Sequence, residues 1–370
     1  MPSPLEPGSK IAILTSGGDA PGMNAAVRAV VRVAAAHKMQ VFGVKWGYQG
    51  LISGEISRLS VRDVDGLSRR GGTILGSSRC LPFQTVEGRA EAAKQLRELE
   101  IQGLVVVGGN GSLTGAMVFA NELDHTGEPF RIMGIPASID NDIAYTTLSI
   151  GVDTALNTIV DACDRIADTA GAHARTFVVE VMGRDCGYLA MTAAIASEAD
   201  GVLFGEEQLN AEAAIDKLVR IVGRAYAPDE GKHRLLVLKS EGVAMDSREL
   251  KTRLDARLAS EGLPVETRVT VLGHVVRGGT PSAFDRVLAG RLSHAAVRAI
   301  IRGRTGEMVG WHVLNVPGGP RGTPFDLDPY VSFWPFAPVL EETRKIADGT
   351  SELTKWRVRV LREAEPILAA

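Results

Sequence analysis

The stretch IAILTSGGDAPGMN, residues 11–24, decides the fold of this chain. It begins with four apolar residues typical of a buried strand and continues through a glycine-rich loop. It then runs into residues 23–37, whose apolar positions recur at helical spacing. A strand that passes through a tight loop into a helix is half of a βα unit, so the stretch predicts a parallel sheet with connecting helices.

The same alternation of apolar runs and helical segments continues from residue 11 almost to residue 320. A second clear helical stripe covers residues 153–169. The predicted strands are residues 11–14, 41–44, 104–107, 132–135, 177–181, 201–204, 235–238, 268–272 and 308–315. Nine strands are too many for one small sheet, so we expect two doubly wound α/β domains with mostly parallel sheets. The alternation stops at residue 324, and we interpret the remainder, with Trp334, Phe336 and a charged helical segment, as a C-terminal extension.

Composition excludes several classes of protein. The 370 residues are 45% hydrophobic and 23% charged, which fits two globular domains rather than a disordered or fibrous chain. The net charge of −3 provides no overall field for nucleic acid or anionic lipid. Cys80, Cys163 and Cys186 lie far apart and indicate neither a disulfide framework nor a zinc site. Residues 1–10 lack the pattern of a signal peptide, so we expect a cytoplasmic protein.

Glycine-rich loops follow two of the predicted strands. The loop at residues 15–24 follows the first strand, and GGNGS, residues 108–112, follows the strand at 104–107. Such loops place free backbone N–H groups and the positive end of a helix at the carboxyl edge of the sheet, where phosphate binds. Neither matches a dinucleotide or P-loop motif, and each alone could be a tight turn. Two loops at equivalent strand ends favour one shared phosphate-binding crevice, and RGGTILGSSR at 70–79 adds a third candidate with arginines.

The segment PASIDND, residues 136–142, follows the strand at 132–135. If it stays extended, Ser138, Asp140 and Asp142 project from one face. One or two carboxylates together with phosphate oxygens make a magnesium site, and a carboxylate can accept a hydroxyl proton in phosphoryl transfer. The alternative is an ordinary turn rich in Asp and Asn.

The second half of the chain contributes cations near predicted strand ends. Arg268 lies inside a predicted strand, where a buried charge needs a partner, and arginine matches the geometry of phosphate. Glu241 could accept hydrogen bonds from sugar hydroxyls or be a surface carboxylate. The other candidates are Arg175, Arg184, His274 and Arg277. From the residues alone, we expect magnesium-assisted transfer of a phosphoryl group from a polyphosphate to a phosphorylated small molecule.

Taken together, these motifs resemble the bacterial glycolytic 6-phosphofructokinase family. The resemblance runs in order from about residue 11 to 315 and rests on residues 14–26, 108–112, 138–142, 181–184 and 271–279. It implies that ATP donates its γ-phosphoryl group to the 1-hydroxyl of fructose 6-phosphate, with Mg²⁺ as cofactor. It also implies a nucleotide-binding domain at residues 1–150 and 275–325, and a sugar-phosphate-binding domain at 151–274 and 326–370 with the C-terminal extension.

The resemblance also assigns roles to individual residues. It implies Asp140 as the general base, with Arg184 and Arg79 near the transferring group, and Asn110 and Asp142 at the metal. The residues implied on the nucleotide side are Gly18, Arg79, Cys80, Gly109, Asn110, Gly111 and Ser112. The residues implied on the sugar side are Ser138, Asp140, Arg175, Met182, Gly183, Arg184, Glu241, Arg268, His274 and Arg277. Arg175 and Arg268 are expected to reach the 6-phosphate of a neighbouring subunit, which implies a homotetramer with shared active sites.

Three departures from the family pattern bear on function. The family usually has aspartate where Asn110 stands, so magnesium binding is expected to be weaker. Pyrophosphate-dependent relatives carry aspartate and lysine where Gly111 and Ala137 stand, and these small residues favour ATP. Arg28 and Arg32 match the effector site only in part, so we do not expect the usual allosteric response. A pyrophosphate-dependent enzyme and a silent regulatory subunit remain alternatives.

Overall fold

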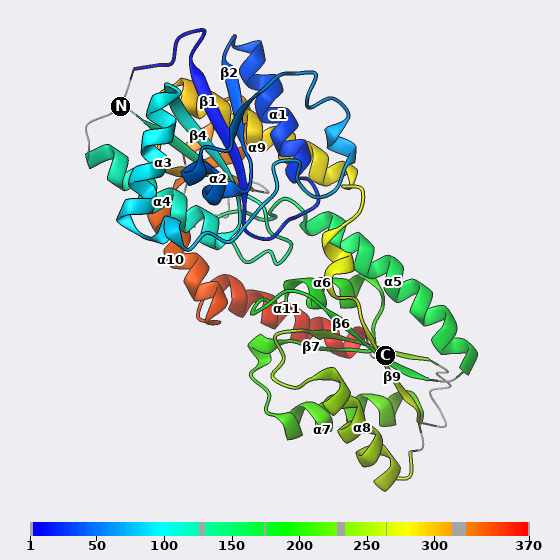
Figure 1. Cartoon of the computed structure of the whole chain (residues 1–370). Helices are drawn as coiled ribbons and strands as arrows, with labels where there is room; N and C mark the ends of the chain where they lie inside the picture. The colour runs from blue at the N-terminus through cyan, green and yellow to red at the C-terminus, as the bar shows by residue number, and fades with distance from the viewer. Residues whose placement is uncertain are drawn as a thin grey trace. The chain divides into compact units, whose positions relative to one another are not determined.

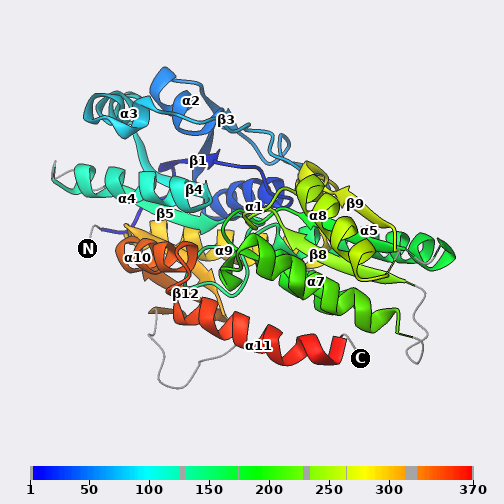
Figure 2. The same ribbon diagram turned by 90° about the horizontal axis from the view of Figure 1, so that it is seen from below.

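A computed structural model describes residues 3–125, 130–173, 175–227, 234–263, 265–312 and 323–368 (Figures 1 and 2). Within these ranges the chain forms two compact units. The first unit takes in residues up to 139 together with 143–154 and 277–344, and the second takes in 140–142, 155–276 and 345 onward. Both are built from strands alternating with helices, which confirms the prediction of two α/β domains with mostly parallel sheets.

The first unit is built around an eight-stranded sheet in the order β11-β12-β10-β5-β4-β1-β2-β3. The five strands from β10 to β2 are parallel, and antiparallel pairs extend the sheet at both edges. The strands are β1 (Lys10–Ser16), β2 (Gln40–Val44), β3 (Ile56–Leu59), β4 (Ile101–Gly108), β5 (Arg131–Pro136), β10 (Glu307–Trp311), β11 (Thr323–Phe325) and β12 (Asp328–Pro335).

Helices cover both faces of this sheet, because its central strands are buried on both sides. Ala12 and Leu14 face a core formed with α2, α3, α4 and α10, while Ile11 faces α9, which packs against α1. Figure 2 shows α2 beside α3. The helices are α1 (Met23–Ala36), α2 (Gly47–Ser53), α3 (Val86–Glu98), α4 (Asn110–His125), α9 (Ala283–Ile301) and α10 (Phe336–Ala347), with 3-10 turns η1 (Leu67–Arg69) and η2 (Pro82–Gln84).

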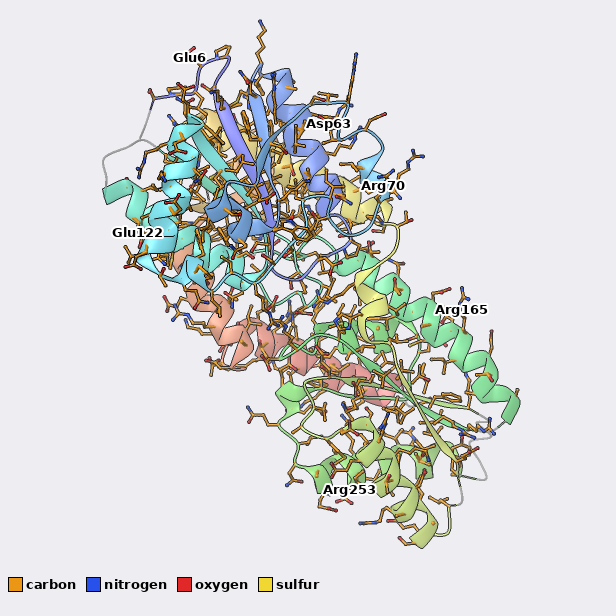
Figure 3. The ribbon with its side chains drawn as sticks, in the orientation of Figure 1. Glu6, Asp63, Arg70, Glu122, Arg165 and Arg253 are labelled. Carbon is orange, nitrogen blue, oxygen red and sulfur yellow. The ribbon has the colours of Figure 1, made fainter. Side chains whose placement is uncertain are left out.

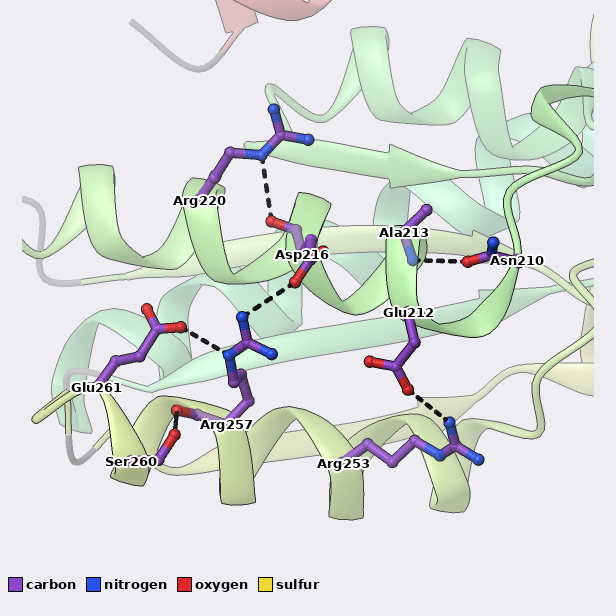
Figure 4. A network of polar contacts seen from close by, with 9 residues as sticks. All are labelled: Asn210, Glu212, Ala213, Asp216, Arg220, Arg253, Arg257, Ser260 and Glu261. Atoms are coloured by element: carbon purple, nitrogen blue, oxygen red, sulfur yellow. Dashed lines mark hydrogen bonds and ion pairs between the residues drawn. The ribbon is translucent and has the colours of Figure 1, made fainter.

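The second unit contains a four-stranded parallel sheet in the order β7-β8-β6-β9. Figure 1 shows α7 and α8 on one face and α6 with α11 on the other. Ion pairs of Arg257 with Asp216 and of Arg253 with Glu212 join α8 to α7 (Figure 4). The elements are β6 (Thr176–Val181), β7 (Gly201–Leu203), β8 (Leu235–Ser240), β9 (Thr267–Val271), α6 (Tyr188–Ala196), α7 (Ala211–Ala225), α8 (Ser247–Ser260), α11 (Glu352–Leu368), and turns η3 (Gly205–Glu207) and η4 (Gly273–Arg277). Helix α5 (Val152–His173) carries the chain from the first unit into the second.

All nine predicted strands are present, although residues 313–315 of the last one lie outside the described residues. The C-terminal prediction needs correction. Residues 326–344, which we expected with the second domain, belong to the first unit because β12 pairs antiparallel with β10 in the larger sheet. Trp334 and Phe336 are therefore core residues, 7% and 1% exposed, and of the C-terminal extension the second unit takes up only the end of α10, from Lys345, and α11.

None of the helices in the described ranges is both long enough and apolar enough to cross a bilayer.

Candidate active site

The two glycine loops lie against each other at the carboxyl ends of β1 and β4, which are neighbours in the larger sheet. A Cβ atom on Gly108 would lie 2.4 Å from the Ser16 carbonyl oxygen, so only glycine permits this approach. A Cβ atom on Gly17 would lie 3.2 Å from the Ser112 hydroxyl. The structure thus brings together the loops that we expected to share one crevice.

Helix α4 begins at Asn110, directly after Gly109. The first turn of a helix has N–H groups without partners in the helix, and these attract anions. Nothing lies within 4 Å of a Cβ atom placed on Gly111, so the space beside this turn is open. Gly109 also neighbours β5, because a Cβ atom there would lie 3.8 Å from Ser138. The loops after β1, β4 and β5 therefore meet around the start of α4.

The segment at residues 70–79 is fixed to the same edge of the sheet. Asn24 donates to the carbonyl oxygens of Arg70 (3.2 Å) and Gly71 (3.0 Å) and accepts from the Ile74 N–H (2.8 Å). The Thr15 hydroxyl donates to the Gly76 carbonyl at 2.8 Å. Arg79 follows this anchored segment and is exposed, and Cys80 is half-buried. The backbone before Arg79 is therefore held in place, while the Arg79 side chain itself is accessible to a ligand.

Arg277 contacts the first glycine loop. Its Nη1 donates to the Asp19 carbonyl oxygen at 3.0 Å, and a Cβ atom on Gly18 would lie 2.7 Å from that nitrogen. The structure groups Arg277 with the first unit, whereas His274 at the other end of the same turn is exposed and belongs to the second. The two residues that we expected at one sugar site thus lie in different units.

The segment after β5 does not stay extended, so the condition under which residues 138, 140 and 142 would project from one face is not met, and the turn that we kept as the alternative is present. Ile139 and Asp140 form a turn, and Asn141 has a φ of 52°. Asparagine tolerates this left-handed conformation, which breaks the two-residue alternation of a strand. Asp140 is nonetheless buried, at 4% exposure, with Asp142 half-buried two residues later.

Arg184 lies beside Asp140 within the second unit. Its Nε is 3.9 Å from the Asp140 Oδ2, and its side chain is 65% exposed. This distance is too long for a hydrogen bond but short enough for an ion pair. The pair combines a buried acidic group with an accessible cation, as a proton acceptor and a phosphoryl-binding group would require.

Glu241 holds the backbone of the loop that carries Arg184. Its Oε1 accepts from the N–H of Gly183 at 3.1 Å and from that of Arg184 at 2.7 Å. Gly183 has a φ of 150°, and a Cβ atom there would lie 2.5 Å from the Cys186 carbonyl oxygen. Glu241, expected to accept from a sugar, thus anchors the loop. Met182, in the same loop, is half-buried.

Arg175 and Arg268 lie together, joined by Glu266. Arg175 Nε is 2.8 Å from one Glu266 oxygen, and Arg268 pairs with the other. The expectation that Arg268 is a buried strand charge is wrong, because β9 is an edge strand of the smaller sheet and the side chain is 47% exposed. The two cations that we expected to act together do lie side by side.

The thiol of Cys186 lies in the loop that carries Arg184, where the Cys186 N–H donates to the Gly183 carbonyl. Burial raises the pKa of Cys186 to about 12, so the group is a neutral thiol at physiological pH. A nucleophilic cysteine requires a thiolate. Covalent catalysis by Cys186 is therefore not indicated.

The described ranges contain no group of three or more His, Cys, Asp or Glu side chains arranged to hold a metal ion. A magnesium ion that bridges phosphates needs only one or two protein oxygens, with water and phosphate completing its shell. The Asp142 carboxylate in the second unit and the Asn110 amide oxygen in the first are each oxygen ligands of the kind that magnesium prefers.

Sequence reasoning assigned no role to three residues that support this site. Asn24 is 2% exposed and anchors residues 70–74, and Tyr48 donates to the Ser112 carbonyl at 2.6 Å, which holds the first turn of α4. Lys239 is 1% exposed and pairs with Glu180 at 2.9 Å, joining the ends of β6 and β8. The role of Asn24 could have been found from the sequence. A polar residue at the start of an otherwise apolar helix is expected to be buried, and a buried amide requires hydrogen-bond partners.

Comparison with known proteins matches residues 10–300 to the family model PFK, Phosphofructokinase. The chain belongs to the phosphofructokinase family. An ATP-dependent 6-phosphofructokinase of Thermotoga neapolitana is 46% identical over 300 residues, which cover 81% of this chain and 89% of that relative. A relative with the same description from Bacillus velezensis is 46% identical over 301 residues, with the same coverage of 81% and 89%.

Solved structures of phosphofructokinases share the fold of this chain. The phosphofructokinase of Saccharomyces cerevisiae superposes with a TM-score of 0.81 at 34% identity over 95% of this chain and 50% of that one. The family member described here thus spans about half the length of the yeast chain. A pyrophosphate-dependent phosphofructokinase from Marinobacter aquaeolei superposes with a TM-score of 0.74 at 20% identity, over 90% of this chain and 83% of that one, which indicates the shared fold alone.

Proposed function

We propose that this phosphofructokinase family member transfers the γ-phosphoryl group of ATP to the 1-hydroxyl of fructose 6-phosphate, giving fructose 1,6-bisphosphate and ADP in glycolysis. The observation that carries the proposal is the 46% identity to ATP-dependent 6-phosphofructokinases across 89% of their length. The reaction uses substrates of the cytoplasm, which is where we propose that the protein acts.

Asp140 is the proposed general base. The 1-hydroxyl oxygen attacks the γ-phosphorus, its proton passes to the Asp140 carboxylate, and the bond to the bridging β,γ-oxygen breaks to release ADP. Arg184 and Arg79 bind the oxygens of the moving group and stabilise the charge that it carries. The 3.9 Å separation of Asp140 and Arg184 supports this assignment.

The first unit supplies the proposed nucleotide site. The α4 terminus, with Gly109, Asn110, Gly111 and Ser112 in or beside it, would offer its free backbone N–H groups to the phosphates, and Gly18 and Cys80 would line the nucleotide. Magnesium, when bound, would neutralise negative charge on the phosphates. Asp142 and Asn110 are the residues proposed to hold it.

The small residues at positions 111 and 137 support ATP as donor over pyrophosphate. The space around Gly111 is open, and Ala137 is 1% exposed and without a charged group. Neither position offers the carboxylate or the ammonium group of the pyrophosphate-dependent pattern. A neutral amide at Asn110 is the one feature that favours a different donor or a silent subunit.

Most residues of the proposed sugar-phosphate site belong to the second unit, while Ser138 and Arg277 belong to the first. Ser138, Met182, Gly183, Arg184, Glu241, His274 and Arg277 are proposed to contact the sugar or position the groups that do. Arg175 and Arg268 are proposed to reach the 6-phosphate bound to a neighbouring subunit of a homotetramer. Both arginines form ion pairs with Glu266, so their guanidinium groups lie close together. This supports a joint role, because two guanidinium groups can bind one dianionic phosphate.

Replacing Glu241 by alanine is expected to raise the KM for fructose 6-phosphate about 10- to 100-fold, because hydrogen bonds to a charged group contribute about 1.5–3 kcal/mol. Without the Glu241 carboxylate, the N–H groups of Gly183 and Arg184 lose their acceptor, and the loop that carries Arg184 is no longer anchored. Steady-state kinetics with varied sugar phosphate measure the change. The matched control is Glu212→Ala on α7, an exposed carboxylate (Figure 4). Equal KM values in the two variants would contradict the anchoring role.

Replacing Asn110 by aspartate is expected to lower the magnesium concentration needed for half-maximal rate on the order of 10-fold. A full charge near a divalent ion, at a helix N-terminus that also favours an anion, strengthens binding. Titrating magnesium at fixed ATP measures the requirement. Asn121→Asp, an exposed position on the same helix, is the control. An unchanged requirement would remove Asn110 from the metal.

A coupled assay tests the proposed function. Purified protein receives fructose 6-phosphate and magnesium with either ATP or pyrophosphate, and the formation of fructose 1,6-bisphosphate is followed through aldolase and a dehydrogenase. Turnover with ATP alone supports the proposal. Turnover with pyrophosphate alone would make the enzyme pyrophosphate-dependent, and turnover with neither would favour the silent subunit.

A further inference from the structure

The C-terminal helix α11 (Glu352–Leu368) lies beyond residues 10–300, which carry the match to the family model. It packs against α6, β7 and η3 of the second unit. One of its side chains, that of the half-buried Arg357, points into the unit instead of outward. The sequence resemblance assigns this residue no role.

Arg357 contacts both segments that carry the proposed catalytic pair. Its Nη1 and Nη2 each lie 3.4 Å from the carbonyl oxygen of Asn141, the residue between Asp140 and Asp142. The same Nη1 lies 3.6 Å from the Sγ of Cys186, two residues after Arg184. One planar group therefore links the turn of Asp140 to the loop of Arg184.

A third contact fixes the orientation of the guanidinium. Its central carbon lies 4.6 Å from the centroid of the Tyr188 ring, the first residue of α6, in a cation–π arrangement. Burial raises the pKa of Glu206, and Arg357 opposes that rise, so the cation also lies near a buried carboxylate. Stacking on Tyr188 and the attraction to Glu206 both favour the observed position of the guanidinium.

Both linked segments contain a non-glycine residue in the left-handed region, Asn141 with a φ of 52° and Arg184 with a φ of 49°. Such conformations persist only where the surroundings hold them. Glu241 holds the Arg184 backbone from one side. Arg357 contacts the Asn141 carbonyl, and it comes from a helix distant in the sequence.

We propose that Arg357 is a positioning residue for phosphoryl transfer: it ties the Asp140–Asp142 turn to the loop at 183–188 and so keeps the Asp140 carboxylate and the Arg184 guanidinium in register. This inference rests on the proposed function, since it gives Asp140 and Arg184 their roles in the reaction. It makes the C-terminal helix part of the catalytic apparatus.

Arg357→Met tests the proposal, because methionine keeps the apolar stem that packs on Tyr188 and removes the guanidinium. We expect kcat to fall about 10- to 100-fold, since a displacement of about 1 Å at a reacting group costs up to about 100-fold. The KM values for ATP and fructose 6-phosphate should change less than about threefold, because no substrate contact is removed. Arg357→Lys, which keeps a charged donor, should recover part of the lost kcat.

The matched control is Arg359→Met, an exposed arginine on the same helix. It should leave kcat at the wild-type value. Thermal unfolding of all three variants shows whether each is folded at the assay temperature. A folded Arg357→Met variant with wild-type kcat would overturn the proposal, as would a loss of rate explained entirely by the fraction unfolded.

Hydrogen exchange measured by mass spectrometry gives a readout that does not depend on activity. In Arg357→Met the amides of residues 138–144 should exchange about 10-fold faster, because the Asn141 carbonyl has lost its cation, while those of β8 should not change. Unchanged exchange at 138–144 would overturn the proposal even if the wild-type protein is active. A wild-type protein without phosphotransfer, but with this exchange difference, would instead refute the proposed function and keep the link.

Discussion

The Asp140→Asn variant is expected to lose about 1,000-fold in kcat, within the range of about 100- to 10,000-fold that general acid–base catalysis contributes. Asparagine keeps the size of the side chain in a site that is 4% exposed, so the turn should survive. It cannot accept the hydroxyl proton. The KM for fructose 6-phosphate should stay within about threefold, because the change removes an interaction made in the transition state.

Steady-state kinetics with ATP and sugar phosphate measure the Asp140 effect, and Asp185→Asn is its control. Asp185 lies one residue after Arg184 and is exposed, so its carboxylate is close in the sequence without being buried. The control should retain wild-type kcat. If Asp140→Asn also retains it, Asp140 is not the base, and the assignment of the segment 138–142 fails with it.

The Arg184→Met variant is expected to lose about 100- to 1,000-fold in kcat. Removing one group that stabilises the charge of the transition state costs about this much in other enzymes. Its side chain is 65% exposed and its Nε lies 3.9 Å from the Asp140 Oδ2, so the replacement breaks no hydrogen bond to that carboxylate and leaves no cavity in the core. The fold should therefore remain intact. The loss should be larger in kcat than in substrate affinity, because the charge on the moving phosphoryl group develops during transfer.

Arg165→Met is the control for Arg184. Arg165 extends from α5 into solvent, with its side chain 77% exposed (Figure 3). Kinetics and thermal unfolding of both variants separate catalysis from stability. A rate for Arg184→Met equal to that of the Arg165 variant would show that the Arg184 cation does not contact the transferring group.

The parallel strands could be predicted because buried strands in such sheets are short continuous apolar runs between helical segments. β3 could not be predicted from the sequence. It is four residues long (ISRL), contains an arginine and lies at the edge of the sheet, so it has no continuous apolar run. β12 was missed for a related reason. Its sequence DPYVSFWP contains prolines at both ends and follows the last helix-like segment, and only its pairing with β10 makes it a strand.

The glycine loops could be predicted together because the carboxyl ends of neighbouring parallel strands meet at one edge. The turn at Asp140 could not, since the left-handed Asn141 depends on contacts such as that from Arg357. Nor could the exposure of Arg268, which follows from β9 lying at the sheet edge. Arg357 itself sits in a charged helical sequence, where no pattern separates an arginine that faces inward from its exposed neighbours.

Phosphorus NMR of one reaction mixture tests the central claim most directly. The sample contains the wild-type protein, magnesium, ATP and fructose 6-phosphate, and spectra are recorded as the reaction proceeds. We predict that the γ-phosphate signal of ATP decreases while a second sugar phosphomonoester signal, at carbon 1, increases equally beside the one at carbon 6. Intact ATP, or conversion of its γ-phosphate to inorganic phosphate without a new sugar ester, would contradict the proposed transfer.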